Sequence, residues 1–328
     1  MRGGAEKTAG LRIRHISMQL FLCVFLLFLC IPAASAAGIR SRAAVVVEAG
    51  TVRVLYAKNP DETLLPASTT KLMTALVVLD SNPDLGRVVT ISKTAAHTAR
   101  TRVGFKAGEK VTVGTLLYSM LMKSANDAAV ALAEEVAGSE EQFAVLMNRK
   151  AAELGATNTR YINANGLPGP GQQITARDLS NIMREAIRHP VVREILATRE
   201  ARVTTESGKT KYIRNTNKLL WADEDILGGK TGYTRDAMHC FVCAGARGGE
   251  TLIVAVLGAP SRRVMWMESE GLLALGSEII SNEAGPSVYP AESDNDTITA
   301  TKASSGRTFH AHTSLLRQPS VLRHLHGL

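Results

Sequence analysis

The sequence predicts a fold of the α+β type, in which a sheet built from both ends of the chain carries an inserted helical lobe. Two observations support this fold. Segments rich in β-branched and apolar residues, which favour strands, lie at residues 43–57 and again between residues 199 and 258. Between them, residues 113–188 place apolar side chains at the 3.6-residue period of helices. We therefore expect a cleft between two lobes, where motifs distant in the sequence meet.

The first elements are a hairpin and a helix. Residues 43–47 and 52–57 are expected to pair around a turn at residues 48–51. The helix that follows has its apolar residues at the i, i+3, i+4, i+7 spacing of one buried face: Leu72, Ala75, Leu76 and Leu79. Ser68 opens this helix. Because helix N-termini carry partial positive charge, a developing oxyanion would be favoured near the Ser68 hydroxyl.

The middle of the chain is expected to form the helical lobe. A helix at residues 113–123 is followed by one at residues 127–137, which stops at Gly138. Ser139 to Gln142 has the form of a capping box for a third helix that runs to Leu154. A fourth is capped by Thr175 and precedes Pro190, and its buried stripe is Leu179, Ile182, Met183 and Ala186.

Strand patterns return after this lobe, and a last helix is expected at residues 263–280. The predicted strands are residues 199–204, 210–213, 230–234, 240–246 and 251–258. Cys240 and Cys243 fall within one of them, and residues three apart in a strand point to opposite faces. We therefore expect two buried thiols here in preference to a disulfide or half a metal site.

The two ends of the chain are expected to lie outside the folded domain. Basic residues precede an apolar stretch at residues 20–31, and residues 34–36 are small, which predicts a signal peptide over residues 1–36. After residue 282 the composition turns to Ser, Thr, Pro, Asp and His with little periodicity. Such a segment buries too little apolar surface to order itself, so residues 283–328 are predicted to be a disordered tail and residues 37–282 the folded domain that carries the function.

The chain is basic, with a formal net charge of +8. Three of these charges belong to the predicted leader, where four basic residues oppose Glu6. The remaining charge suits anionic wall polymers or lipid headgroups, and a weak association with membrane surfaces is one such outcome. Export and the absence of a long Lys/Arg run argue against nucleic acid as a partner.

Three short motifs predict a serine acyl-transfer site. They are Ser68-x-x-Lys71, Ser124-x-Asn126 and Lys230-Thr231-Gly232, in that order and with wide gaps between them. A serine hydroxyl is a weak nucleophile unless a base lies within hydrogen-bond reach. On a helix, side chains at i and i+3 share one face, so Lys71 is placed to accept the proton of Ser68.

The residues around these motifs resemble the low-molecular-mass penicillin-binding proteins, and within them the D-alanyl-D-alanine carboxypeptidases. The resemblance covers about residues 40–280 and includes Asn165-Gly166-Leu167. It implies the penicillin-binding and β-lactamase-like fold, with an antiparallel sheet flanked by helices. It also implies an exported enzyme, in the periplasm or at the outer face of the cytoplasmic membrane, that trims peptidoglycan stem peptides and is acylated by β-lactams.

The resemblance further implies a role for each motif residue. Ser68 would attack the penultimate D-alanine, Lys71 would be its base, and Ser124 would relay a proton to the leaving D-alanine. Substrate-binding residues would be Asn126, Lys230, Thr231, Gly232, Tyr233 and Arg235. Among these, the amides of Ser68 and Tyr233 would form the oxyanion hole, and Thr231 and Arg235 would bind the terminal carboxylate of the substrate.

Two other functions share parts of this pattern. Class A β-lactamases deacylate with a loop glutamate, and residues 155–175 contain no Asp or Glu. A non-catalytic peptidoglycan-binding module would have no need of intact Ser68, Lys71, Ser124 and Lys230. The pairs His310/His312 and His324/His326 could be read as zinc ligands, but no carboxylate accompanies them. We expect no metal and no cofactor.

Overall fold

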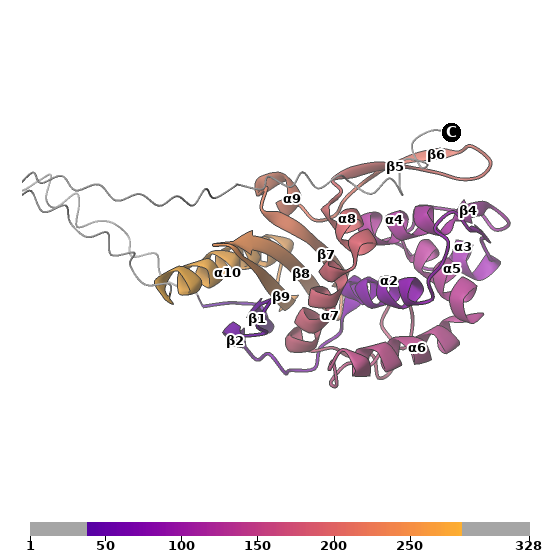
Figure 1. Cartoon of the computed structure of the whole chain (residues 1–328). Coiled ribbons are helices and arrows are strands. Elements are labelled where there is room, and N and C mark those ends of the chain that lie inside the picture. The colour runs from indigo at the N-terminus through magenta and orange to yellow at the C-terminus, as the bar shows by residue number, and fades with distance from the viewer. Residues whose placement is uncertain (1–37, 284–328) are drawn as a thin grey trace, which may run out of the picture. The chain divides into compact units, whose positions relative to one another are not determined.

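Both ends of the domain build one antiparallel sheet, as the sequence predicted. The computed structural model describes residues 38–283. The sheet has the order β2-β1-β9-β8-β7, so the N-terminal hairpin pairs with the last strand (Figure 1). Its strands are β1 (Ala43–Glu48), β2 (Val54–Lys58), β7 (Ile226–Thr234), β8 (Met238–Arg247) and β9 (Glu250–Ala259). Strand β7, which carries the Lys-Thr-Gly motif, lies at one edge.

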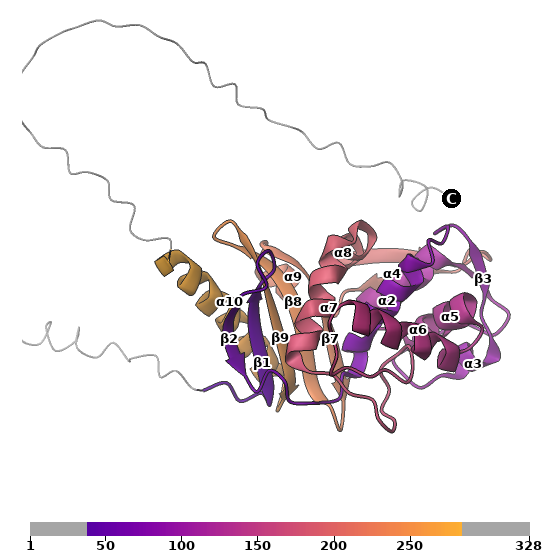
Figure 2. The same ribbon diagram turned by 60° about the horizontal axis from the view of Figure 1, so that its bottom comes forward.

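The two faces of this sheet bury different cores. Helix α10 (Arg262–Glu283) covers one face, and the helical lobe packs on the other (Figure 2). Strand β8 supplies both cores, because successive side chains alternate between the faces of a strand. Cys240 belongs to the core under the lobe and Cys243 to the core under α10. Both are free and buried, as predicted from their spacing.

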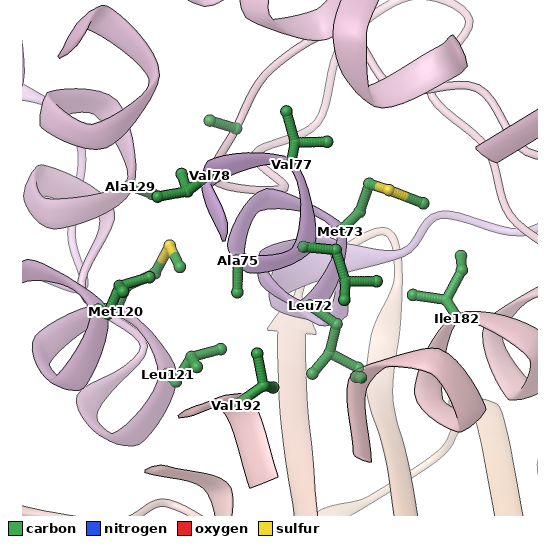
Figure 3. Packing of buried hydrophobic residues seen from close by; sticks show 14 of the residues in the cluster. Leu72, Met73, Ala75, Val77, Val78, Met120, Leu121, Ala129, Ile182 and Val192 are labelled. Carbon is green, nitrogen blue, oxygen red and sulfur yellow. The ribbon is translucent and has the colours of Figure 1, made fainter. Parts of the chain in front are cut away.

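Helix α2 (Lys71–Asp80) is the centre of the lobe. Its side chains pack on Met120 and Leu121 of one neighbour, Ala129 of a second, and Ile182 and Val192 of two more (Figure 3). A helix that is apolar on nearly every side is buried in the core. The surrounding helices are α3 (Lys93–His97), α4 (Val113–Lys123), α5 (Asn126–Ala137), α6 (Glu140–Glu153), α7 (Ala176–Arg188) and α8 (Pro190–Ala197).

The predicted helix caps are present where the sequence placed them. Ser139 Oγ accepts a hydrogen bond of 3.2 Å from the Gln142 amide at the start of α6. Thr175 Oγ1 accepts one of 3.0 Å from the Asp178 amide at the start of α7. Gly138 ends α5 in the left-handed conformation, at φ +79°. These polar signals are local, which is why the sequence located them closely.

Several short elements differ from the sequence prediction. Pro190 does not merely follow α7, because it is the first residue of α8, a position that tolerates its missing amide hydrogen. Strands β5 (Glu200–Thr204) and β6 (Thr210–Arg214) form a separate hairpin and do not join the large sheet. The pair β3 (Val88–Thr90) and β4 (Lys110–Thr112) and the turn-length α9 (Leu219–Ala222) carry no clear periodic signal.

The predicted signal peptide and residues 284–328 of the predicted tail lie outside the described residues, as do the four histidines near the C-terminus. Glu283, the first residue of the predicted tail, is instead the last residue of α10. Within residues 38–283 none of the helices combines the length and apolar character that crossing a membrane requires. The same residues contain no group of three or more His, Cys, Asp or Glu side chains arranged to hold a metal ion.

Candidate active site

Ser68 and Lys71 lie on one face where a short 3₁₀ turn leads into α2. The turn, η1 (Ala67–Thr70), directly precedes α2, so Ser68 sits one turn before the α-helix proper. The i, i+3 spacing places Lys71 Nζ 2.9 Å from Ser68 Oγ. Ser68 is half-buried and lines the cleft, whereas Lys71 is fully buried. The Ser68 hydroxyl is therefore open to the cleft, and the Lys71 amine is shielded from water.

Three oxygen atoms surround the buried amine of Lys71. Besides Ser68 Oγ, Asn126 Oδ1 lies 2.7 Å away and the carbonyl oxygen of Asn165 lies 2.5 Å away. Burial, followed by the nearby charge of Lys230, holds the pKa of Lys71 well below that of a free lysine. Both causes disfavour the ammonium form, so the neutral amine that a general base requires is populated at lower pH.

The second motif forms the tight junction between α4 and α5. Ser124 ends α4 in the left-handed conformation, at φ +61°, and Asn126 is the first residue of α5. The Asn126 side chain donates to the Ala99 carbonyl at 2.9 Å, which orients its oxygen toward Lys71. Ala125 is fully buried in the core, so the middle residue of this motif points away from the reacting groups.

Lys230 connects the third motif to the second. Its amine lies on β7, fully buried, 2.9 Å from Ser124 Oγ and 2.9 Å from the Thr231 carbonyl oxygen. Burial lowers the pKa of Lys230 to about 7. Thr231 Oγ1 donates to Thr216 Oγ1 at 2.8 Å, on the side of the strand that faces the cleft. The three motifs are thus joined by side-chain contacts that span 106 residues.

A cleft of about 710 Å³ opens above these groups. Gly232 lies so close to η1, the turn that carries Ser68 (called the catalytic turn below), that an added Cβ would stand 3.0 Å from the Ser68 amide nitrogen. Next to it, Tyr233 is 58% exposed and its ring centroid lies 4.5 Å from that of His239. The described lining contains basic and aromatic side chains and no Asp or Glu: Lys123, Arg214, Lys218, Arg262, Trp221, Trp266, Tyr233 and His239 are among its members.

The structure places Arg235 outside the described cleft lining. This residue is exposed in the turn between β7 and β8 and is not part of the described cleft lining. Arg262, the first residue of α10, lines the cleft instead. The two arginines are 27 positions apart, and only the packing of α10 against the sheet shows which of them reaches the site.

Two residues without a predicted role also reach the site. Asn165 contributes its backbone carbonyl to Lys71, and the Glu140 carboxylate accepts from Asn165 Nδ2 and from the Ala164 amide, each at 3.1 Å. The Asn165-Gly166-Leu167 segment resembles the family, but this resemblance did not predict that the Asn165 carbonyl contacts Lys71. Glu140 belongs to a capping-box sequence, and that pattern predicts the start of a helix but no contact with the active site.

Gly166 fits where no other residue can, and we expect Gly166→Ala to destabilise the protein. An added Cβ would stand 1.9 Å from the Ala67 carbonyl oxygen, and the residue has φ +83°. The backbone of the catalytic turn would have to move, at a cost of roughly 2–4 kcal/mol in the free energy of unfolding. The melting temperature and the rate of acylation by penicillin should both fall.

Gly155→Ala is the matched control for this change. Gly155 also has a left-handed backbone, at φ +70°, but nothing lies within 4 Å of its added Cβ. It should therefore show the cost of the backbone conformation without the clash. Equal melting temperatures and acylation rates for the two variants would contradict the tight contact between Gly166 and the catalytic turn.

Known proteins resemble the chain throughout this domain. A family model described as D-alanyl-D-alanine carboxypeptidase matches residues 31–261. The carboxypeptidase DacF of Bacillus subtilis is 35% identical over 67% of this chain and 57% of its own length. DacC of Escherichia coli is 37% identical over 76% of this chain and 66% of its own. The chain thus spans less than two thirds of these two relatives.

Among solved structures, the Streptomyces K15 DD-transpeptidase superposes with a TM-score of 0.69 at 32% identity. The match covers 73% of this chain and 97% of that one. At this identity and coverage the likeness extends to the whole described domain. It confirms the predicted fold class, an antiparallel sheet flanked by helices with a helical lobe.

Proposed function

The chain belongs to the D-alanyl-D-alanine carboxypeptidase family, and on that premise we propose that it removes the terminal D-alanine from peptidoglycan stem pentapeptides through a Ser68 acyl-enzyme. One observation carries the proposal. A cleft-lining serine hydroxyl lies 2.9 Å from a buried lysine amine whose pKa is strongly lowered. A nucleophile paired with a neutral amine base is the arrangement that acyl transfer requires.

In the acylation step, Ser68 Oγ attacks the carbonyl carbon of the penultimate D-alanine and its proton passes to Lys71 Nζ. The tetrahedral intermediate then collapses, the peptide bond breaks, and the leaving D-alanine amine takes up a proton. We assign Ser124 Oγ as the relay for that proton, because it lines the cleft and contacts the Lys230 amine. It donates its hydroxyl proton to the leaving amine and recovers the proton that Lys71 took from Ser68, so the Ser124 hydroxyl and the neutral Lys71 amine are both restored. Asn126 holds Lys71 in place through its 2.7 Å contact.

The substrate is expected to lie along β7 as an added strand. This strand is the edge of the sheet, and edge strands present unpaired backbone groups that an extended peptide can use. Gly232 lets β7 lie close against the turn that carries Ser68, and the amides of Ser68 and Tyr233 are our candidates for the oxyanion hole. Such a donor is typically worth about 3 kcal/mol in the transition state.

For the terminal carboxylate of the substrate, we propose Thr231 and Arg262. The Thr231 hydroxyl is held toward the cleft by its contact with Thr216, and Arg262 contributes a guanidinium at the cleft wall. A guanidinium binds a carboxylate through two parallel hydrogen bonds. Arg262 replaces Arg235 in this role, since Arg235 lies in the exposed turn outside the lining.

The competing β-lactamase function is not favoured, because class A β-lactamases deacylate with a glutamate that activates water. The described cleft lining contains no acidic side chain. Glu140 approaches the site from α6, but its Oε1 is engaged by the Ala164 amide and Asn165, and the residue does not line the cleft. A non-catalytic wall-binding module remains the other alternative, and covalent labelling by penicillin separates it from an enzyme.

We expect the penicilloyl-enzyme to persist. The cleft lining has no carboxylate of the kind that class A β-lactamases use to activate the deacylating water, so hydrolysis must proceed through the Lys71 and Ser124 network. Intact-protein mass spectrometry after mixing with penicillin should show the adduct still present well after acylation is complete. Rapid steady-state hydrolysis of penicillin would instead favour the β-lactamase alternative.

The activity itself is tested by incubating the purified protein with stem pentapeptide and with cross-linked muropeptides, followed by mass spectrometry. We expect a product shorter by one D-alanine from the pentapeptide. Cleavage of cross-links alone would make the protein an endopeptidase, and no cleavage of either would favour a binding module. We also propose an exported location, with the net positive charge providing at most a weak, salt-sensitive attraction to membrane surfaces.

A further inference from the structure

Glu140 lies close enough for its charge to act on Lys71, although it does not line the described cleft. It is the first residue of α6 and is partly buried. Its Oε1 accepts hydrogen bonds from the Ala164 amide and from Asn165 Nδ2, each at 3.1 Å. Neither Glu140 nor Asn165 lines the described cleft. The carboxylate is therefore directed at the loop behind Lys71, away from any bound substrate.

The loop that Glu140 holds is in turn attached to the catalytic helix. The Asn165 carbonyl oxygen lies 2.5 Å from Lys71 Nζ, and the Ala164 carbonyl accepts from Thr74 Oγ1 at 2.6 Å. The Asn165 side chain is fixed from its other end as well, because its Oδ1 accepts from the Leu167 amide at 2.9 Å. A continuous set of contacts thus runs from Glu140 through Asn165 to Lys71 and on to Ser68.

We propose that Glu140 is a positioning residue for acylation, because its carboxylate fixes the 164–165 backbone so that the Asn165 carbonyl holds Lys71 Nζ in reach of Ser68. The inference rests on the proposed function and extends it to a residue that does not touch the substrate. Without the Glu140 carboxylate, the 164–165 loop loses the hydrogen bonds that fix it beside the Lys71 amine, so the amine is held less firmly. A displacement of about 1 Å at a reacting group can cost up to about 100-fold in rate.

The charge of Glu140 adds a second, separable effect. Three charged groups face Lys71 from the elements around it: Lys230 on β7, Glu140 on α6 and Asp127 on α5. Lys230 lowers the pKa of Lys71, whereas Glu140 and Asp127 raise it. Removing the Glu140 charge should therefore lower the Lys71 pKa further, and the acid limb of the acylation profile should move to lower pH.

A purely structural role is the alternative, since acidic residues in a first helical turn stabilise the helix dipole. Glu141 provides the matched control, because it lies in the same first turn of α6 and is exposed. Glu141→Gln removes the same charge from the same helix end without touching the 164–165 loop. Any effect that comes only from the helix end should appear equally in both glutamine variants.

The experiment measures the rate of covalent labelling of Ser68 by a fluorescent penicillin from about pH 5 to pH 9. Glu140→Gln keeps an oxygen acceptor for the Ala164 amide, so its plateau rate should remain within about threefold of wild type while the acid limb moves to lower pH. Glu140→Ala loses the acceptor as well, and its plateau should fall by about tenfold or more. Glu141→Gln should change neither quantity.

The outcomes separate the two proposals. If the wild-type protein is acylated but the acid limb and plateau of both Glu140 variants equal those of Glu141→Gln, the positioning role of Glu140 is overturned. The same conclusion follows if Glu140→Ala loses only melting temperature while its acylation profile is unmoved. A wild-type protein that penicillin does not label at all would instead contradict the serine acyl-enzyme on which the inference rests.

Discussion

Ser68→Ala is expected to abolish both penicillin labelling and D-alanine release, because one hydroxyl performs both reactions. Ser68 is the serine whose oxygen lies 2.9 Å from the Lys71 amine, and it lines the cleft. Losing the nucleophile of an acyl-enzyme mechanism typically lowers the rate by on the order of a thousandfold or more. Removing one half-buried hydroxyl should leave the melting temperature within a few degrees of wild type.

Ser124→Ala is the matched serine control for this experiment. Ser124 Oγ lies on the Lys230 side of the site, so the variant keeps the nucleophile and its base. It should still form a covalent penicillin adduct, at a reduced rate. Peptide mapping of the adduct identifies the labelled residue in each variant. An adduct in Ser68→Ala that maps to another residue would show that the nucleophile has been assigned wrongly.

Lys230→Gln is expected to move the acid limb of the acylation profile to higher pH and to slow acylation. The positive charge of Lys230 is the second cause, after burial, of the lowered Lys71 pKa. A neutral glutamine removes that repulsion, so the Lys71 pKa should rise by roughly one unit or more. The active form is the neutral amine, and the limb follows the Lys71 pKa in the same direction. Glu140→Gln should move the same limb the opposite way.

Lys123→Gln tests whether the loss of any positive charge from the cleft shifts the acid limb, or only the loss of the Lys230 charge. Lys123 lines the same cleft but is exposed, so water and salt screen its charge from Lys71. Its substitution should leave the acid limb in place. The measurement is the pH dependence of second-order acylation for the three proteins. If the pH profile of Lys230→Gln coincides with those of wild type and Lys123→Gln, the proposed effect of Lys230 on the Lys71 pKa and on acylation is wrong.

Much of the fold and the pairing of Ser68 with Lys71 could be predicted from local sequence signals. The helix at residues 113–123 has the bounds that its apolar period predicted, and the Ser139 and Thr175 caps lie at their predicted positions. These features depend on residues a few positions apart. The i, i+3 relation of the catalytic pair is of the same kind, which is why a motif of four residues already indicated its chemistry.

Other features depend on residues that lie far apart in the sequence. Lysines are almost never fully buried unless they are paired, yet Lys71 and Lys230 are both fully buried. Their lowered pKa values follow from the packing of α2 at the centre of the lobe and of β7 against the catalytic turn. No pattern within either motif encodes that burial.

The sequence by itself determined which residues can react, because the spacing of serine, lysine and glycine is a local property of helices and strands. Only the tertiary structure decided which residues surround them. It placed the Asn165 carbonyl on an amine 94 positions away and brought Arg262, rather than Arg235, to the cleft. It also brought Glu140 behind the 164–165 loop. The physical reason is that such contacts arise when separate elements pack together, and packing depends on the shape of the whole core rather than on any one segment.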